Sequence, residues 1–210
     1  ATGFRGPLFI VDDNFIGNKQ KVKELLREII IWQKKYGHPF SLSTEASINL
    51  ADDDELLELM AEASFMMVFV GIETPVEESL SLAGKTQNLK GNLLESIRKI
   101  QGRGIEVTGG FIIGFDTDPE DIFDRQIGFV RESAIPTAMV GLLMALPNTR
   151  LYRRLEAEGR ITGLSTGNNT HDVRVNFESK LPPGVLYDGY RRVIREIYGP
   201  RAYFDRCLEL

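Results

Sequence analysis

The sequence predicts an α/β protein built on a curved parallel sheet, a partial TIM-like (β/α) barrel, followed by a helical C-terminal extension. Short apolar or β-branched runs alternate with longer segments of helical period, which is the pattern of parallel strands joined by crossover helices. Five such units follow one another with short connections, and this suits a curved or barrel-like sheet better than a doubly wound one. We therefore expect residues 1–160 to form the barrel and residues 161–210 to pack on it.

Each strand and helix is predicted by its own residue pattern. The expected strands are residues 8–11, 40–48, 67–72, 107–115 and 138–145, and apolar residues at helical spacing follow each of them. Asp52 and Glu55 resemble a capping box, and Thr117, Asp118 and Pro119 supply a cap and a first-turn proline for a helix that runs to about residue 130. Beyond residue 159 we expect a polar loop, a strand-like segment at 173–177 and helical segments from 185 to 208.

The composition excludes several classes of protein. The 210 residues are 42% hydrophobic, enough for one sizeable core, and 25 basic residues stand against 30 acidic ones, for a net charge of −5. Nucleic acid and anionic membranes are therefore not expected as obligatory partners. The single cysteine, Cys207, cannot form an internal disulfide, and no apolar run reaches the roughly 18–20 residues of a membrane span. We predict a reducing, cytoplasmic setting.

The first residues contain neither an initiator methionine nor the basic and apolar regions of a signal peptide, and they run directly into the first strand. We expect the sequence to begin in the middle of a longer protein.

Polar side chains recur where the expected strands end. A single acid after a strand is most often a helix cap or a solvated loop residue. Several acids on one edge of a barrel are less easily explained this way, because like charges held together need a cation or many hydrogen-bond donors. The arrangement predicts a cationic, hydroxyl-bearing or metal ligand. The residues concerned are Asp12, Asp13, Asn14, Glu45, Glu73 and Asp116.

Glycines accompany these acids within or at the ends of strands. Gly71 precedes Glu73, and Gly109, Gly110 and Gly114 lie in the fourth strand. A glycine there weakens the sheet and marks close approach of a ligand or of another part of the chain. Ligand contact and tight packing of strand against helix are both open explanations.

Two other patterns carry no site. Lys85 and Thr86 resemble the end of a phosphate-binding loop, but the first glycine that this loop requires is missing. His38 and His171 are far apart in the sequence, so neither a zinc site nor a Ser–His triad is supported.

Four blocks resemble, in order and spacing, the motifs of radical S-adenosylmethionine enzymes. They are Phe-Ile-Val-Asp-Asp-Asn-Phe-Ile-Gly-Asn from residue 9, Leu-Leu-Glu-Leu-Met-Ala-Glu-Ala from residue 56, Val-Phe-Val-Gly-Ile-Glu-Thr from residue 68 and Gly-Gly-Phe-Ile-Ile-Gly-Phe-Asp from residue 109. The resemblance is to the cobalamin-binding-type branch, which includes anaerobic cyclases, methyltransferases and hopanoid-modifying enzymes. Two later blocks, residues 169–177 and 189–200, resemble the C-terminal extension of that branch, so the resemblance covers nearly the whole chain.

The resemblance implies a six-stranded open barrel in which this chain supplies strands two to six. The family's first strand and the Cys-x-x-x-Cys-x-x-Cys loop that holds a [4Fe–4S] cluster are missing, and Cys207 cannot replace three thiolates. An intact member reductively cleaves S-adenosylmethionine to a 5′-deoxyadenosyl radical that attacks a small-molecule substrate. We expect this fragment to be inactive alone, and the intact protein to use the cluster, S-adenosylmethionine and a cobalamin.

The resemblance also assigns roles to residues. It implies that Asp12, Asp13 and Asn14 lie near the amino group of S-adenosylmethionine, that Glu45 and Glu73 accept from its ribose hydroxyls, and that Lys85 faces its carboxylate. By the same resemblance, Gly110 to Gly114 allow close approach of the adenosyl group, and Met144 to Leu146 flank the adenine. Two departures are visible: many relatives carry arginine in place of Lys85, and often proline in place of Asp116, which is expected only to cap a helix.

Two alternatives remain open from the residues alone. A magnesium-dependent barrel would use Asp12, Asp13, Glu45 and Glu73 as oxygen ligands, but it would need a lysine or histidine at a strand end. A non-enzymatic binding module would leave the same acids as solvated caps. If the family's first strand is missing, the open edge at residues 8–11 is expected to pair with another chain or to be covered by the C-terminal tail.

Overall fold

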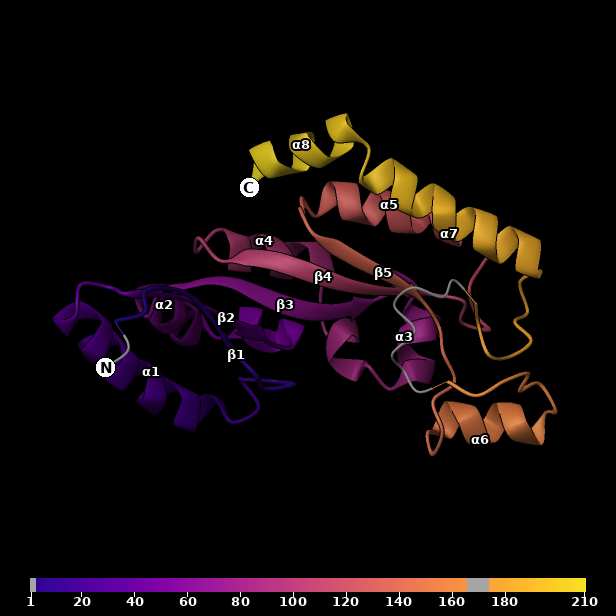
Figure 1. Cartoon of the computed structure of the whole chain (residues 1–210), viewed down its shortest axis with the longest axis horizontal. Coiled ribbons are helices and arrows are strands. Elements are labelled where there is room, and N and C mark those ends of the chain that lie inside the picture. The colour runs from indigo at the N-terminus through magenta and orange to yellow at the C-terminus, as the bar shows by residue number, and fades with distance from the viewer. Residues whose placement is uncertain (1–2, 166–173) are drawn as a thin grey trace.

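The computed structural model describes residues 3–165 and 174–210. Within them the chain forms one sheet of five parallel strands in the order β1-β2-β3-β4-β5. The sheet curves, and helices pack along it (Figure 1), which confirms the predicted partial α/β barrel. His171 and Val173 lie outside the described residues. The rest of the strand-like segment predicted at 173–177 forms no strand and makes one isolated bridge, between Phe177 and Ile161. The strands are β1 Gly6–Ile10, β2 Phe40–Glu45, β3 Phe65–Glu73, β4 Glu106–Ile113 and β5 Ala138–Leu142.

The predicted helices are present, and three short elements were not predicted. The longer helices are α1 Lys19–Lys35, α2 Asp54–Glu62, α4 Leu93–Gln101, α5 Ile122–Glu132, α6 Arg150–Ala157, α7 Pro183–Ile197 and α8 Pro200–Glu209. The additional elements are α3 Glu77–Ala83 and the 3-10 helices η1 Ile48–Asp52 and η2 Thr86–Leu89. Such short segments span at most two turns, too few for helical periodicity to distinguish them from a loop.

Strands β2 and β3 bury alternate residues, as parallel strands covered on one side by helices do. Along β3, Val68, Val70 and Ile72 are fully buried among the residues of the main core. Phe69 and Glu73 point to the other, concave side and are only partly buried. The period of two therefore separates a helix-covered face from a face that is free to line a site.

The start of α2 lies one residue later than its sequence pattern predicts. Asp53, not Asp52, is the N-cap, and its carboxylate accepts from the Leu56 amide at 3.1 Å. Lys23 of α1 binds the same carboxylate at 2.8 Å. Asp53 therefore joins two helices while capping one, which a local capping rule does not detect.

The C-terminal helices pack along the helix-covered face near β5. Helix α7 lies beside α5, and α8 follows it along the same side (Figure 1). The Tyr198 hydroxyl accepts from the Ala138 amide at 3.0 Å and donates to its carbonyl at 2.9 Å, so the end of α7 is tied to the start of β5. Among the described helices, none combines the length and the apolar composition that a membrane crossing requires.

Candidate functional site

A cavity of about 420 Å³ opens where strands β3, β4 and β5 end. Figure 1 shows α3 and α6 at this end of the sheet. In parallel barrels this carboxyl edge carries the functional groups, because the loops after the strands converge there. The lining of this ligand cavity combines apolar walls with charged ends, and it consists of Glu73, Leu82, Ala83, Lys85, Ile112, Phe115, Asp116, Thr117, Leu143, Arg150, Leu151 and Arg154.

Glu73 and Lys85 form an ion pair in the cavity wall. Lys85 Nζ lies 2.6 Å from Glu73 Oε1, and the two side chains are 38% and 13% exposed. Glu73 has a positive φ of 70°, and the pairing of β3 with β4 is irregular between Gly71 and Glu73. A left-handed backbone at a glutamate is uncommon and is typical of functional positions. The structure thus brings together two residues predicted for the site, although Lys85 is already neutralised by Glu73.

The irregularity folds the Glu73 side chain back over the strand. A Cβ atom at Gly71 would lie 2.8 Å from Glu73 Oε1, so a larger residue there would displace this carboxylate from its observed position.

The glycines of β4 are close to side chains of the protein. A Cβ at Gly110 would lie 2.7 Å from Cζ of Phe69, and a Cβ at Gly109 would lie 2.7 Å from Cε2 of Phe111. These contacts support tight packing at both positions. Gly114 differs, because its φ of 111° is accessible only to glycine. A role for Gly110 and Gly114 in contacting a ligand stays a prediction.

The predicted polar groups at β1 and β2 lie outside the cavity lining. Asn14 Oδ1 accepts from the Ser47 amide at 3.1 Å, and Asp12 Oδ1 accepts from the Asn14 amide at 2.9 Å, so Asp12 and Asn14 shape the loop between these strands. Asp13 is exposed and Glu45 is partly buried. Within the described residues, no three or more carboxylate, histidine or cysteine side chains converge as a metal site would need. The magnesium alternative gains no support from this arrangement.

Asp118 closes the end of β4. Its Oδ2 accepts from the Gly114 amide at 2.7 Å and from the Phe115 amide at 3.0 Å. Burial raises the pKa of the Asp118 carboxyl to about 6, although these amide donors act in the opposite direction. Asp118 was predicted to help cap the next helix, and that prediction is wrong, because α5 begins at Ile122 after Asp121.

Replacing Asp118 with asparagine is expected to remove a pH dependence of stability. The pKa of Asp118 is about 6 in the folded protein and 3.8 as a reference value, so between these limits the folded state holds a proton that the unfolded state has lost. The stabilising contribution of Asp118 is therefore present below pH 4 and is lost as the pH rises through 6, by about 3 kcal/mol in total. Urea unfolding at several pH values measures the free energy of unfolding. As the pH rises across this window, the value for wild type should fall relative to that of D118N. The exposed control D188N should differ from wild type by the same free energy at every pH. If D118N also differed from wild type by a constant amount, the raised pKa of Asp118 would be contradicted.

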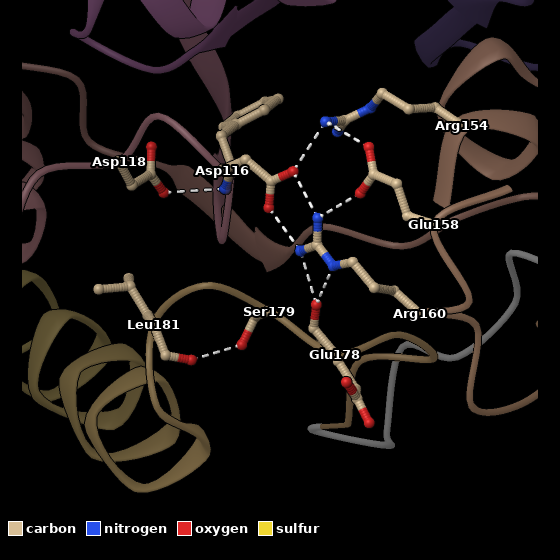
Figure 2. A network of polar contacts seen from close by, with 9 residues as sticks. Asp116, Asp118, Arg154, Glu158, Arg160, Glu178, Ser179 and Leu181 are labelled. Atoms are coloured by element: carbon tan, nitrogen blue, oxygen red, sulfur yellow. Dashed lines mark hydrogen bonds and ion pairs between the residues drawn. The ribbon is translucent and has the colours of Figure 1, made fainter. Parts of the chain in front are cut away.

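Asp116 lies at the centre of a network that the sequence did not reveal. Figure 2 shows its carboxylate between Arg154 and Arg160, and the side chain is only 5% exposed. The hydrogen bonds from Arg160 hold the pKa of the Asp116 carboxyl below its usual range, although burial opposes them. The prediction that Asp116 only caps a helix is wrong. No local pattern could have found this network, because Asp116 and Arg160 are 44 residues apart.

The fold and the cavity define a class of protein. A curved parallel sheet with helices on one face, and a cavity of mixed apolar and charged lining at the carboxyl ends of its strands, is the arrangement of barrel proteins that bind small molecules. The comparisons with known proteins identify the family within this class.

The chain is similar over nearly its whole length to two curated proteins. It is 45% identical over 204 residues to an uncharacterised methyltransferase of Synechocystis sp. and 38% identical over 204 residues to the hopanoid C-2 methylase of Rhodopseudomonas palustris. Each alignment covers 97% of this chain and 38% of the relative, so the chain spans little more than a third of their length. The sequence model of a domain of unknown function, DUF4070, matches residues 149–210.

A solved structure shares the fold. The radical S-adenosylmethionine methyltransferase TsrM from Kitasatospora setae, determined with cobalamin and a [4Fe–4S] cluster bound, superposes with a TM-score of 0.62 at 18% identity. The match covers 77% of this chain and 30% of TsrM. The chain belongs to the radical S-adenosylmethionine superfamily, in its cobalamin-binding-type branch.

Proposed function

We propose that this chain forms the S-adenosylmethionine-binding part of a radical S-adenosylmethionine methyltransferase. The observation that carries the proposal is the ligand cavity at the ends of β3, β4 and β5, with the Glu73–Lys85 pair in its wall. The relatives that are methyltransferases support the reaction class, and the TsrM structure supports the cofactors, S-adenosylmethionine, cobalamin and a [4Fe–4S] cluster.

The cavity residues fit parts of S-adenosylmethionine. The Glu73 carboxylate is partly buried and can accept hydrogen bonds from ribose hydroxyls, while Lys85 and Arg150 offer cations for a carboxylate. The apolar side chains Leu143 and Leu151 can cover an adenine or a substrate and exclude water. Asp12, Asp13, Asn14 and Glu45 remain proposed contacts of the amino and ribose groups at the β1 and β2 end.

The chain's own residues do not fit an iron–sulfur cluster. Cluster ligation requires several thiolates, and the sequence has only Cys207, which is exposed on α8. We therefore propose that the chain is inactive alone and that the cluster is held by another part of the whole protein. When bound there, the cluster would supply the electron for reductive cleavage of S-adenosylmethionine, the step that makes the whole protein an oxidoreductase.

The substrate is proposed to be a small molecule with an apolar portion. Half of the side chains that line the cavity are apolar, and they come from α3, β4, α6 and the segments that follow β4 and β5. A relative that is 38% identical is a hopanoid methylase, which supports this substrate class. We further propose that residues 161–210 form an extension distinct from the barrel and that the protein works in a reducing, cytoplasmic setting.

The free edge of β1 is proposed to pair with another strand. β1 pairs only with β2 in the described residues, and Leu8 and Phe9 are exposed on it. The alternative that the C-terminal tail covers this edge is wrong, because α7 and α8 lie near β5 at the other edge (Figure 1). Pairing with a second chain or with another segment of the whole protein would satisfy the open backbone groups.

Replacing Glu73 with glutamine is expected to weaken S-adenosylmethionine binding by about 10- to 100-fold, because the substitution removes the charged acceptor for the ribose hydroxyls. Isothermal titration calorimetry with S-adenosylmethionine measures the change. Glu78→Gln, on an exposed position of α3, is the matched control and should bind as wild type does.

Calorimetry with magnesium chloride separates the alternatives. A magnesium-dependent barrel would bind magnesium, and its Glu73→Gln variant would not. A scaffold module would bind neither magnesium nor S-adenosylmethionine. If Glu73→Gln bound S-adenosylmethionine as tightly as wild type does, Glu73 would not be a binding residue. If wild type did not bind S-adenosylmethionine, the proposed function of this chain would be contradicted.

A further inference from the structure

We propose that Arg160 latches α6 to the carboxyl edge of the barrel through Asp116, so that these two are positioning residues of the ligand cavity. The identity of the ligand rests on the proposed function, whereas the latch rests on contacts within this chain. Asp116 is one of the strand-end acids and lies in the cavity lining, whereas Arg160 was not predicted for the site, and the two are brought together only by the fold.

The latch is a paired contact between two planar groups. Arg160 Nη1 donates to Asp116 Oδ2 at 2.8 Å, and Arg160 Nη2 donates to Asp116 Oδ1 at 2.7 Å. The side chains are 16% and 5% exposed, so water screens the contact weakly. A two-point Arg–carboxylate contact fixes orientation as well as distance, which a single lysine contact cannot do.

Arg160 is itself fixed from two further directions (Figure 2). Its Nε and Nη2 donate to the Glu178 carbonyl at 2.8 and 2.6 Å, and its Nη1 donates to Glu158 Oε2 at 2.8 Å. The Arg160 amide donates to the Leu155 carbonyl at 2.9 Å, which ties the guanidinium to the last turn of α6. One side chain thus connects the loop after β4, the end of α6 and the segment around Glu178.

Among the described residues, helix α6 makes few apolar contacts. Its one fully buried side chain there, Leu155, belongs to a small cluster with Ala145 and Phe177 that is separate from the main core, and Leu151 and Tyr152 pack against that cluster. A helix of eight residues is too short to persist without tertiary contacts. The polar latch therefore provides a large share of what orients α6.

The orientation of α6 determines one wall of the cavity. Arg150, Leu151 and Arg154 of α6 line it together with Glu73 and Lys85. Arg154 also reaches Asp116, with Nη1 2.8 Å from Oδ2, so the same carboxylate holds the middle of the helix and the residue that follows it. Both arginines also pair with Glu158, at 3.7 and 2.8 Å, but that residue follows α6 itself, so only Asp116 joins them to the loop after β4 among the described residues. Loss of the Asp116 carboxylate would release the wall from the barrel.

The test compares local opening of α6 with ligand affinity in matched variants. Hydrogen exchange measured by mass spectrometry reports the protection of α6, β3 and β4, and calorimetry reports the affinity for S-adenosylmethionine. The variants are Asp116→Asn, Arg160→Gln and Arg160→Lys. The control is Arg125→Gln, which removes an exposed Arg–Asp pair of 2.8 Å within α5 and away from the cavity.

We expect α6 amides to exchange at least about 10-fold faster in Asp116→Asn and Arg160→Gln, with β3 and β4 unchanged, and S-adenosylmethionine to bind about 10-fold more weakly. Arg160→Lys keeps the charge and should fold and recover part of both losses, which makes it decisive if Asp116→Asn does not fold. Arg125→Gln should match wild type in both measurements.

Unchanged protection of α6 in Arg160→Gln and Arg160→Lys would overturn the latch. Faster exchange of α6 with wild-type affinity would overturn the positioning role, because the wall would then not matter to the ligand. If wild type does not bind S-adenosylmethionine, the proposed function fails for this chain, and the exchange of α6 alone decides whether the latch exists.

Discussion

Replacing Arg206 with alanine is expected to lower the free energy of unfolding by about 2–4 kcal/mol. Arg206 is 2% exposed, although it is an arginine on α8, the last helix of the chain. Its Nε donates to the Ile135 carbonyl at 2.7 Å, its Nη2 to the Pro136 carbonyl at 3.2 Å and its Nη1 to the Ala202 carbonyl at 3.0 Å. Alanine would leave these carbonyls without their donor and would leave a cavity where the guanidinium was.

The position of these carbonyls explains the size of the effect. Ile135 and Pro136 lie just before β5, at the end of the sheet opposite the ligand cavity, so Arg206 ties the last helix to the last strand. Burial lowers the pKa of the Arg206 guanidinium, and no carboxylate forms an ion pair with it among residues 3–165 and 174–210. The three carbonyls accept its hydrogen bonds, and the ring of Tyr203 lies beside the guanidinium, with its centroid 6.0 Å from Arg206 Cζ. A buried cation without a carboxylate partner depends on these contacts.

Urea unfolding followed by circular dichroism measures this effect. Arg201→Ala is the matched control, because Arg201 lies on the same helix and its side chain is 96% exposed. Its substitution should change the free energy of unfolding by less than about 0.5 kcal/mol. Equal effects of the two substitutions would show that α8 contributes little to the stability of the barrel.

Replacing Gly189 with alanine is expected to destabilise the protein by about 2 kcal/mol, despite the higher helix propensity of alanine. Gly189 lies in α7 against the ring of Phe123 in α5. A Cβ at Gly189 would lie 2.5 Å from Phe123 Cδ1 and nearer still to two other ring carbons. The ring is buried and cannot move away freely, so α7 would have to separate from α5.

Gly184→Ala provides the control on the same helix. No atom lies within 4 Å of a Cβ built at Gly184, so alanine gains helix propensity there without a clash. It should raise the free energy of unfolding by about 0.5–1 kcal/mol. Thermal unfolding of both variants measures the opposite signs, and stabilisation by Gly189→Ala would mean that α5 and α7 are not packed as closely as the structure shows.

The fold was largely predictable because it depends on local patterns. The alternation of strands and helices identified every strand, to within a few residues at each end, and every helix longer than seven residues in the described chain. The short helix α3 was missed, and β2 ends at Glu45 where a continuation to Ile48 was expected. These errors concern a very short helix and the end of a strand. In both places few consecutive residues have the same backbone conformation, so tertiary contacts outweigh local propensity.

The candidate site was predictable only in part. Glu73 and Lys85 were both identified, yet their contact depends on the irregular end of β3 and on Gly71. The space above Gly110 is taken by the ring of Phe69, and nothing in the spacing of these residues indicated that pairing. Strand register decides which side chain covers which glycine, and register is a property of two strands together.

The sequence by itself determined the curved parallel sheet, the order of its strands and the edge at which a ligand site would lie. It did so because hydrophobic periodicity and strand-end residues are local signals that survive without tertiary contacts. Only the tertiary structure decided that Asp116 binds Arg160, that α6 forms a cavity wall and that Arg206 is buried at β5. Each of these joins residues 40 or more positions apart, and their free energy exists only once the chain has folded.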